Sequence, residues 1–325
     1  MAPRLSVLIP TRNRGAILER VIQGIASDPE AAALGKAGLE VLALGDGCTD
    51  DTGARVERLR GSVPFALRWF ALAQGGANAA RNVGLREAAG EVVLILNDDT
   101  IPQPGCLAAH LAFHDRMPDQ AQGALGRVTL DPAIPGTLLR SLHLDRSWRE
   151  LEGRTQLTWR EFWTANLSLK KRFLDRTQVR FDESLRYVHD DVEMGWRLET
   201  FGLRLWYVPE AIAHHHHPLT LEEYLRMGDR EGASLALWDQ RLVPRFRRLL
   251  RAYRYTPALP LAARVFKYGL LDLAVNPLTE PLVLAAARAS EERRPALARL
   301  LYGAAYARRK RAAIRRVRRG GLAYP

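Results

Sequence analysis

The sequence predicts an α/β protein whose mostly parallel sheet is flanked by helices on both faces. Short apolar runs recur along the first hundred residues, and segments with apolar residues at helical spacing separate them. This alternation of strand and helix is typical of parallel sheets, because their crossover connections are helices. At 325 residues the chain is long enough for a large α/β domain and a smaller second domain.

Four strand and helix pairs are expected in order. Strands are expected at 5–10, 39–44, 65–72 and 91–96, and helices at 17–25, 49–59, 77–89 and 104–117. Pro10 closes the first strand, either Thr49 or Asp50 can cap the second helix, and Gly90 stops the third helix.

The following residues are less regular. Residues 118–165 show no clear pattern, and their tryptophans either fill the core or line an acceptor cleft: Trp148, Trp159 and Trp163. Residues 166–169 are expected to be extended, and a helix is expected at 190–201. Residues 203–208 predict a further strand, which Pro209 breaks.

The most informative stretch is the fourth strand with the residues that follow it, 91–102. Its consecutive apolar residues predict a strand buried on both faces, and the strand runs directly into the carboxylates of Asp98 and Asp99. Two unit charges about 4 Å apart repel by roughly 4 kcal/mol at an effective dielectric near 20. The pair therefore requires a cation or strong hydrogen-bond donors. A simple polar turn is the alternative explanation for an isolated Asp-Asp.

Three loops of the expected sheet, 10–14, 45–48 and 97–100, converge at the same edge. In open α/β sheets, ligands bind beyond the carboxyl ends of the strands. The segment 45–47 does not begin a GxGxxG fingerprint, because position 50 is Asp, and no GxxxxGK[ST] motif is present. The sequence therefore argues against a P-loop NTPase.

The acidic helix start at 190–193 has a structural and a catalytic explanation. Asp190 with Glu193 resembles a capping box, and acidic side chains there gain about 0.3–1 kcal/mol from the helix dipole. Asp190, Glu193 and Arg197 share one helix face, so an ion pair is expected there. This account leaves Asp191 on a different face and free, as a general base requires.

Two histidine groups are candidate metal ligands. His110 and His114 have i, i+4 spacing, but the segment between them lacks the Glu of a zinc protease motif, so a partly buried helix face is the favoured interpretation. The run 214–217 follows the last expected strand. Its histidines could be solvated, but a carboxylate pair expected at the same sheet edge favours metal ligation by one of them.

The overall composition indicates a globular protein of a reducing compartment. Hydrophobic residues make up 47% of the chain and charged residues 26%, which excludes a disordered chain. Cys48 and Cys106 predict no disulfide framework. No signal-peptide pattern begins the chain, and no uncharged apolar run reaches the length of a membrane span. A cytoplasmic location is expected.

Charge divides the chain unevenly and predicts a domain boundary. Residues 241–325 hold 20 Lys and Arg against 4 Asp and Glu, whereas the rest of the chain carries a net charge of −4. We expect one domain at 1–218 and a helical, basic region at 219–325, with helices at 221–237, 241–255, 259–273, 281–289 and 302–319. The basic region suggests an anionic membrane surface or nucleic acid as a partner, and the membrane is favoured.

Together these motifs resemble the inverting nucleotide-sugar glycosyltransferases of family 2, which have the GT-A fold. The resemblance covers roughly residues 4–217, and its segments come in the family's order. They are the opening strand at 6–13, residues 45–50 in place of DDGSTD, 80–84 for ARNxG, 97–99 with Pro102 for the DXD-type motif, Asn166 and 181–183 on the acceptor side, 190–197 for EDxxxxxxR, and Pro209 followed six residues on by His215.

The resemblance implies a donor site in the first hundred residues. Asp46 would accept a hydrogen bond from the donor's base, and Arg81 would contact the nucleotide. The nucleoside pocket would be shaped by Pro10, Thr11 and Arg12.

The resemblance also implies a metal site and a base. Asp98 would lie near the ribose or the metal, and Asp99 would be the main carboxylate ligand of Mg²⁺ or Mn²⁺. His215, or its neighbour His214, would be a further metal ligand. Asp191 would deprotonate the acceptor hydroxyl in a single in-line displacement.

Two positions depart from the family pattern. Gly45 stands where many members have the first Asp of DDGS, which removes a polar contact to the nucleoside. Asn97 replaces the first Asp of a triple-acid motif, which weakens the metal site if that position is a ligand.

The resemblance implies transfer of a sugar from a nucleoside diphosphate, by default UDP, to a glycan or lipid-linked acceptor in cell-surface or secreted glycan synthesis. A peripheral place on the inner face of the cell membrane would suit such an acceptor, whereas nucleic acid is the less favoured partner. The alternative is a non-catalytic GT-A-like scaffold whose basic tail binds membrane or nucleic acid. The sequence specifies neither the sugar nor the acceptor.

Overall fold

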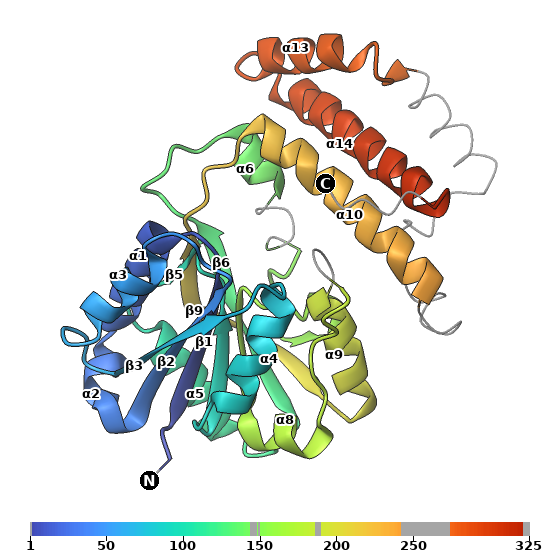
Figure 1. Cartoon of the computed structure of the whole chain (residues 1–325). Helices are drawn as coiled ribbons and strands as arrows, with labels where there is room; N and C mark the ends of the chain where they lie inside the picture. The colour runs from blue at the N-terminus through green and yellow to red at the C-terminus, as the bar shows by residue number, and fades with distance from the viewer. Residues whose placement is uncertain (1, 144–147, 149, 186–189, 242–273, 321–325) are drawn as a thin grey trace. The chain divides into compact units, whose positions relative to one another are not determined.

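The computed structural model describes residues 2–143, 148, 150–185, 190–241 and 274–320 (Figure 1). The chain divides into two compact units. Residues 1–136 and 144–218 form the first unit, and residues 137–143 and 219–325 form the second. The short segment 137–143 thus groups with the second unit, although it lies inside the expected 1–218 domain.

A single sheet forms the centre of the first unit, with its strands in the order β3-β2-β1-β4-β8-β6-β9-β5 and β7 beside β9. Its first half is parallel, as predicted. It consists of β3 (Ala66–Leu72), β2 (Leu39–Asp46), β1 (Leu5–Thr11) and β4 (Val92–Leu96). Because these strands run in the same direction, the ends of β1, β2 and β4 meet at one edge of the sheet.

The second half of the sheet is mixed and was largely absent from the sequence prediction. It consists of β8 (Asn166–Lys170), β6 (Gln122–Leu130), β9 (Arg204–His215), β5 (Thr100–Pro102) and β7 (Gln156–Leu157). β8 is antiparallel to β4 and β6, β6 is parallel to β9, and β5 and β7 are antiparallel to β9. Of these strands, the sequence indicated only β8 and the first part of β9.

The prediction that Pro209 ends the last strand is wrong. β9 continues to His215, and the proline lies where the register with β6 shifts, from Val208 opposite Gly126 to Ile212 opposite Arg127. A bulge leaves residues outside the hydrogen-bonded ladder, so a residue without an N–H is tolerated there.

Helices cover both faces of the sheet, and β1 divides its side chains between them. Leu5, Val7 and Ile9 pack in one hydrophobic cluster and Leu8 in the other, as the two-residue period of a strand requires. The first cluster takes in α1 (Gly15–Ala26), α2 (Pro29–Gly38), α3 (Thr52–Leu59) and part of α5 (Cys106–Arg116). The second takes in α4 (Ala77–Glu87), α8 (Lys171–Thr177), α9 (Asp190–Thr200) and residues next to the 3-10 turn Trp159–Glu161.

The tryptophans of the irregular region mostly fill the core. Trp148 belongs to the second cluster, Trp163 packs against it, and Trp159 is buried. Elsewhere the predicted helices at 17–25, 77–89 and 104–117 are confirmed to within three residues, whereas α2 was not predicted.

The second unit is helical throughout its described part. It contains α6 (Leu138–His143), α10 (Leu221–Arg241), α13 (Glu280–Ser290) and α14 (Pro295–Arg318). Tyr302 and Ala305 of α14 lie at its core, and Arg308 pairs with Glu280. The helices expected at 241–255 and 259–273 lie almost wholly outside the described residues. Among the helices that are described, none has the length and hydropathy needed to cross a membrane.

Candidate active site

A pocket of about 260 Å³ lies beyond the carboxyl ends of β1, β2 and β4, where the sequence predicted a ligand. Its lining residues are Pro10, Thr11, Arg12, Arg14, Asp46, Ala77, Arg81, Asn97, Asp98 and Asp99. All the residues predicted to bind the donor are in this set, together with one predicted metal ligand. The sequence prediction missed Arg14 and Ala77.

The carboxylate pair at the end of β4 is compensated by a guanidinium. Arg14 Nη1 lies 2.8 Å from Asp98 Oδ1, and Arg14 Nη2 lies 3.0 Å from Asp99 Oδ2. The hydroxyl of Thr11 donates to the other oxygen of Asp98 at 2.8 Å. The cation that the Asp-Asp sequence requires is therefore supplied, in this structure, by the chain itself.

Local backbone geometry places Arg14 over the pair. Asn13 has a left-handed backbone with φ of 51°, which asparagine tolerates better than most residues. Its side-chain oxygen accepts from the backbone N–H of Thr49 at 2.8 Å. This contact fixes the turn between β1 and α1, so that Arg14, the residue just before α1, lies within hydrogen-bond distance of both carboxylates.

Burial and neighbouring charges act differently on the two carboxyl groups. Burial raises the pKa of Asp98 above its ordinary value and outweighs the opposing charge of Arg14. Burial would also raise the pKa of Asp99, but the hydrogen bond and charge of His215, with the charges of Arg14 and His217, hold it far below the usual range. Asp99 is thus the more strongly ionised of the two.

The histidine run is divided between two carboxylates. The pairing of β5 with β9 sets Thr100 opposite His215, and His215 Nε2 lies 3.5 Å from Asp99 Oδ1. His217 Nδ1 lies 3.5 Å from Asp99 Oδ2. His216 instead contacts Asp131 at 2.5 Å. These contacts favour His215 over His214 beside Asp99, and they add His217, which the sequence prediction did not include.

The donor set at Asp99 fits a divalent metal that also binds a diphosphate. In the described part of the chain no three His, Cys, Asp or Glu side chains form a complete metal cage. Asp99 nevertheless combines an ionised carboxylate with two neighbouring imidazoles. Mg²⁺ is commonly held by one or two carboxylates, with phosphate oxygens and water supplying its remaining ligands.

Asp46 at the end of β2 organises the loop before α4. Its Oδ1 accepts from the backbone N–H groups of Gly75, at 2.6 Å, and Gly76, at 2.9 Å. Among the described residues its Oδ2 has no hydrogen-bond donor, so this oxygen can accept from a bound base. The neighbouring Gly45 is required for packing, because a Cβ there would lie 2.2 Å from the Trp69 ring.

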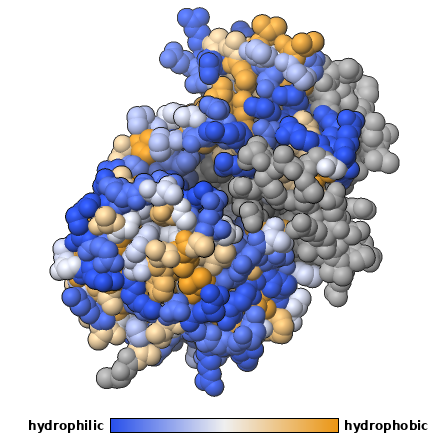
Figure 2. Space-filling view, viewed as in Figure 1, coloured by the Kyte–Doolittle hydropathy of each residue, from blue (hydrophilic) through white to orange (hydrophobic). Residues whose placement is uncertain are grey.

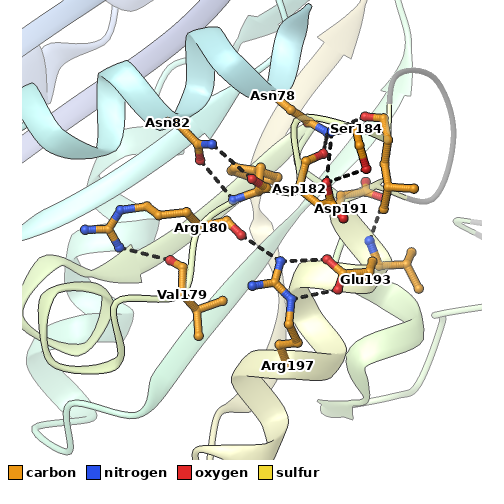
Figure 3. Close-up of polar contacts among 12 residues, drawn as sticks. Asn78, Asn82, Val179, Arg180, Asp182, Ser184, Asp191, Glu193 and Arg197 are labelled. Carbon is orange, nitrogen blue, oxygen red and sulfur yellow. Dashed lines mark hydrogen bonds and ion pairs between the residues drawn. The ribbon is translucent and has the colours of Figure 1, made fainter. Parts of the chain in front are cut away.

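α4 joins the pocket to the segment that precedes α9. Arg81 lines the pocket, and its Nη1 lies 3.0 Å from Asp190 Oδ2. Asn82 pairs with the backbone of Phe181, accepting at 2.9 Å and donating at 3.0 Å. Asn78 donates to the carbonyl oxygens of Asp182 and Leu185 (Figure 3). Asn78 and Asn82 thus hold the 181–185 segment, a structural role that sequence reasoning missed.

Asp191 is fixed by hydrogen bonds, which corrects the expectation that its carboxylate is free. Its Oδ1 accepts from its neighbour Val192 N–H at 2.8 Å, and its Oδ2 accepts from Thr164 N–H at 3.3 Å. The predicted ion pair on α9 is confirmed between Glu193 and Arg197, whose guanidinium grips both carboxylate oxygens (Figure 3). Asp190 pairs with Arg81 instead.

The other predicted histidine pair is structural, as favoured from the sequence. His110 and His114 are buried, and both contact the hydroxyl of Ser168. His110 Nε2 lies 3.0 Å from Asn166 Oδ1, and Asn166 also donates to Ala211. Asn166, expected on the acceptor side, is instead fully buried in this network.

The fold and this pocket define the class of protein. A parallel half-sheet, an Asp-Asp pair after its last strand β4 and an acidic start of α9 are the features of the GT-A fold predicted from the sequence. Residues 6–176 match the sequence profile described as Glycosyl transferase family 2, and residues 92–289 match that of Glycosyl transferase family group 2. The chain belongs to glycosyl transferase family 2.

Individual relatives and structures agree with this assignment. A probable glycosyltransferase, YdaM, of Bacillus subtilis is 23% identical over 70% of this chain and 54% of its own length. The mannosyltransferase PcManGT of Pyrobaculum calidifontis, in complex with GDP-Man and Mn²⁺, has a TM-score of 0.59 at 20% identity, covering 94% of this chain and 86% of its own. S. aureus TarS 1–349 in complex with UDP-GlcNAc has a TM-score of 0.53 at 18% identity, covering 98% and 92%. The chain spans about half the length of the curated relatives it matches first.

Proposed function

We propose that this protein transfers a sugar from a nucleoside diphosphate to an acceptor hydroxyl with inversion at the anomeric carbon. The observation that carries the proposal is the pocket that gathers Asp46, Arg81, Asp98 and Asp99 at the carboxyl ends of the parallel strands. Family membership supports the reaction class. The competing hypothesis is a non-catalytic scaffold, and a measurement of turnover distinguishes the two.

Different residues of the site bind different parts of the donor. Asp46 Oδ2 accepts from the base, and Thr11 and Asp98 lie beside the ribose. Asp99 and His215 would hold a divalent metal, Mn²⁺ or Mg²⁺, which would act as a Lewis acid and stabilise the leaving diphosphate. The Mn²⁺ complex of PcManGT supports the use of such a metal.

Asp191 is the general base of the proposed reaction. The acceptor oxygen bonds to the anomeric carbon while its proton passes to the Asp191 carboxylate. The bond from that carbon to the diphosphate oxygen breaks, and its electron pair leaves with the nucleoside diphosphate. The N–H groups of Val192 and Thr164 fix the Asp191 carboxylate. Arg81 connects the donor pocket with Asp190, the residue before Asp191.

The donor base is tested by binding. UDP is the default donor, and structural neighbours bound to UDP-GlcNAc and to GDP-Man support two different nucleotides. Titration of the protein with UDP, dTDP and GDP in the presence of Mn²⁺ is expected to give one preferred nucleotide. Equal and negligible binding of all three would contradict a donor site in this pocket.

Turnover tests the reaction itself. The full chain with Mn²⁺ is expected to release nucleoside diphosphate from at least one sugar nucleotide in a donor panel. Asp191→Asn is expected to reduce this rate by roughly 10³-fold, because loss of a general base costs about 10²–10⁴-fold. Its nucleotide affinity should remain unchanged. Asp175→Asn, which alters an exposed carboxylate on α8, is the matched control. Absence of both turnover and nucleotide binding would favour the scaffold.

We also propose that the second unit brings the enzyme to an anionic membrane surface, where it extends a glycan or lipid-linked acceptor for the cell surface or for secretion. Residues 274–320 carry 12 Lys and Arg against 3 Asp and Glu, which supports attraction to anionic lipid. The inner face of the cell membrane is the proposed location, and the two free cysteines fit a reducing compartment.

A further inference from the structure

The Asp98–Asp99 pair has all its oxygens occupied by groups of the chain itself. Arg14 contacts one oxygen of each carboxylate, Thr11 donates to the second oxygen of Asp98, and His215 lies beside the second oxygen of Asp99. Arg14 Nη2 also lies 3.5 Å from His217 Nδ1. A metal ion that binds Asp99 must therefore enter a position that a guanidinium already neutralises.

We propose that Arg14 is a counter-ion of Asp98 and Asp99 that controls metal binding. It weakens the binding of a metal ion alone at Asp99, and it allows the metal to bind there when the donor diphosphate is also bound. This inference rests on the proposed function. A guanidinium and a divalent cation at the same carboxylate repel each other, so Arg14 lowers the affinity for the free metal. A diphosphate supplies the negative charge that allows both cations to remain.

The position of Arg14 allows it to exchange one anion for the other. Its side chain is about one third exposed, whereas those of Asp98 and Asp99 are 9% exposed. It lines the same pocket as the residues assigned to the donor. The planar guanidinium matches carboxylate and phosphate oxygens equally well, in the same two-pronged geometry. Rotation of this side chain therefore carries the charge from the carboxylates to the diphosphate without movement of the backbone.

The consequence is a coupling between metal and nucleotide. Each ligand neutralises the charge that disfavours the other, so bound nucleotide raises the metal affinity and bound metal raises the nucleotide affinity by the same factor. Removal of the Arg14 charge weakens this coupling, because free metal then binds the carboxylates directly. Arg14 is in this sense a positioning residue that determines the order of binding.

Metal binding without turnover tests the proposal. The affinity for Mn²⁺ alone is measured by electron paramagnetic resonance on the wild type and on Arg14→Met, which keeps the length of the side chain but not its charge. Arg14→Met is expected to bind free Mn²⁺ about tenfold more tightly, which corresponds to about 1.4 kcal/mol. With UDP present, the factor by which nucleotide improves Mn²⁺ binding is expected to fall.

Arg12→Met is the matched control, because Arg12 lines the pocket but forms no hydrogen bond or ion pair with either carboxylate among the described residues. It corrects for the general effect of removing a positive charge nearby. Thermal unfolding shows whether each variant is folded, and Mn²⁺ alone should stabilise Arg14→Met more than the wild type.

The outcomes separate this inference from the proposed function. Arg14→Met could bind free Mn²⁺ no more tightly than Arg12→Met while the wild type binds Mn²⁺ together with UDP. In that case the role proposed for Arg14 is wrong, whereas the proposed donor site is supported. If the wild type binds neither Mn²⁺ nor nucleotide in any combination, the proposed function fails and the inference with it.

Discussion

At the scale of single residues, the ion pair of Arg81 and Asp190 connects the pocket at the carboxyl ends of the parallel strands with the start of α9. The two side chains are 10% and 14% exposed, and the Arg81 guanidinium compensates the charge of the Asp190 carboxylate. Arg81→Met is expected to destabilise the first unit by about 3 kcal/mol, because it leaves a largely buried carboxylate without its partner. Urea unfolding followed by tryptophan fluorescence measures this loss, since six of the seven tryptophans lie in the first unit.

A double-mutant cycle checks the cause. Arg81→Met with Asp190→Asn should cost less than the sum of the single changes, by about 1–3 kcal/mol, because the second change removes the uncompensated charge. Strictly additive losses would mean that the two charges do not interact in solution.

The buried histidines make stability depend on pH. Burial lowers the pKa of His110 to about 4 and that of His114 to about 3. An unfolded histidine has a pKa of about 6.5, so the unfolded chain binds more protons between pH 4 and pH 6.5. The contribution of these two histidines to stability is therefore fully present above pH 6.5 and is lost as the pH falls below it. At pH 5 the contribution of His110 alone is expected to fall by about 2 kcal/mol.

Unfolding free energies at pH 7.5 and pH 5 measure this effect. The double variant His110→Gln with His114→Gln should be less stable than the wild type at pH 7.5, because the contacts to Ser168 and Asn166 are disturbed. Its stability should change much less between the two pH values. An unchanged pH dependence in this variant would assign the acid sensitivity to other groups.

At the scale of elements, the bulge between β6 and β9 determines where the histidines lie. A Cβ on Gly126 would meet Asn166 Nδ2 at 2.3 Å and the carbonyl oxygen of Ala211 at 2.6 Å. Gly126→Ala is expected to cost about 1–3 kcal/mol, the usual effect of overpacking. It should also weaken Mn²⁺ binding in the presence of UDP, because β9 carries His215 to Asp99.

Gly136→Ala is the control for this change, because a Cβ added at Gly136 would have no neighbouring atom within 4 Å and the φ of this glycine is not positive. Unfolding and Mn²⁺ titration of both variants separate the bulge from a general effect of replacing glycine. Equal behaviour of the two variants would show that the bulge does not position His215.

The same elements explain which parts could be predicted. The parallel half of the sheet was predictable, because each strand is a local apolar run bounded by turn residues. β5 and the long form of β9 were not, since their pairing joins residues 85 or more positions apart and overrides the break expected at Pro209.

The residues of the candidate site also fall into those that the sequence could predict and those that it could not. Asp46, Arg81, Asp98 and Asp99 could be found from motifs, and the structure brings them into one pocket. The role of Arg14 could not be found, because it depends on a left-handed Asn13 and on a contact across 84 residues. The sequence indicated a cation beside the carboxylates but contained no local signal that an arginine supplies it.

At the scale of the whole molecule, the second unit presents an apolar helix face. Four of the five exposed large hydrophobic side chains among the described residues belong to this unit: Leu278, Leu282, Leu297 and Leu300. Leu278 and Leu282 are 87% and 72% exposed, and Ala285, Ala286 and Ala289 continue the exposed face along α13. In Figure 2, apolar side chains gather at the top, over the place of α13 in Figure 1.

Some of the basic residues of α14 are paired within the second unit, whereas arginines close in the sequence to the exposed leucines are exposed. Arg308 and Lys310 of α14 pair with Glu280 and Glu231, so their charges are used within the unit. Arg293, Arg294 and Arg299 are exposed and lie close in the sequence to Leu297 and Leu300. Exposed leucines flanked by arginines suit the interface of an anionic membrane, where apolar side chains enter and arginines meet the headgroups.

Vesicle binding by the full chain tests this surface. Leu278→Ser with Leu282→Ser is expected to reduce sedimentation with vesicles containing phosphatidylglycerol by about tenfold or more, because burial of each leucine contributes about 1.5–3 kcal/mol. Phe201→Ser is the matched control, because Phe201 is an exposed large hydrophobic residue of the first unit. Wild-type binding should weaken with salt and be absent from neutral phosphatidylcholine vesicles. Equal losses in both variants, or DNA binding without vesicle binding, would contradict membrane docking through α13.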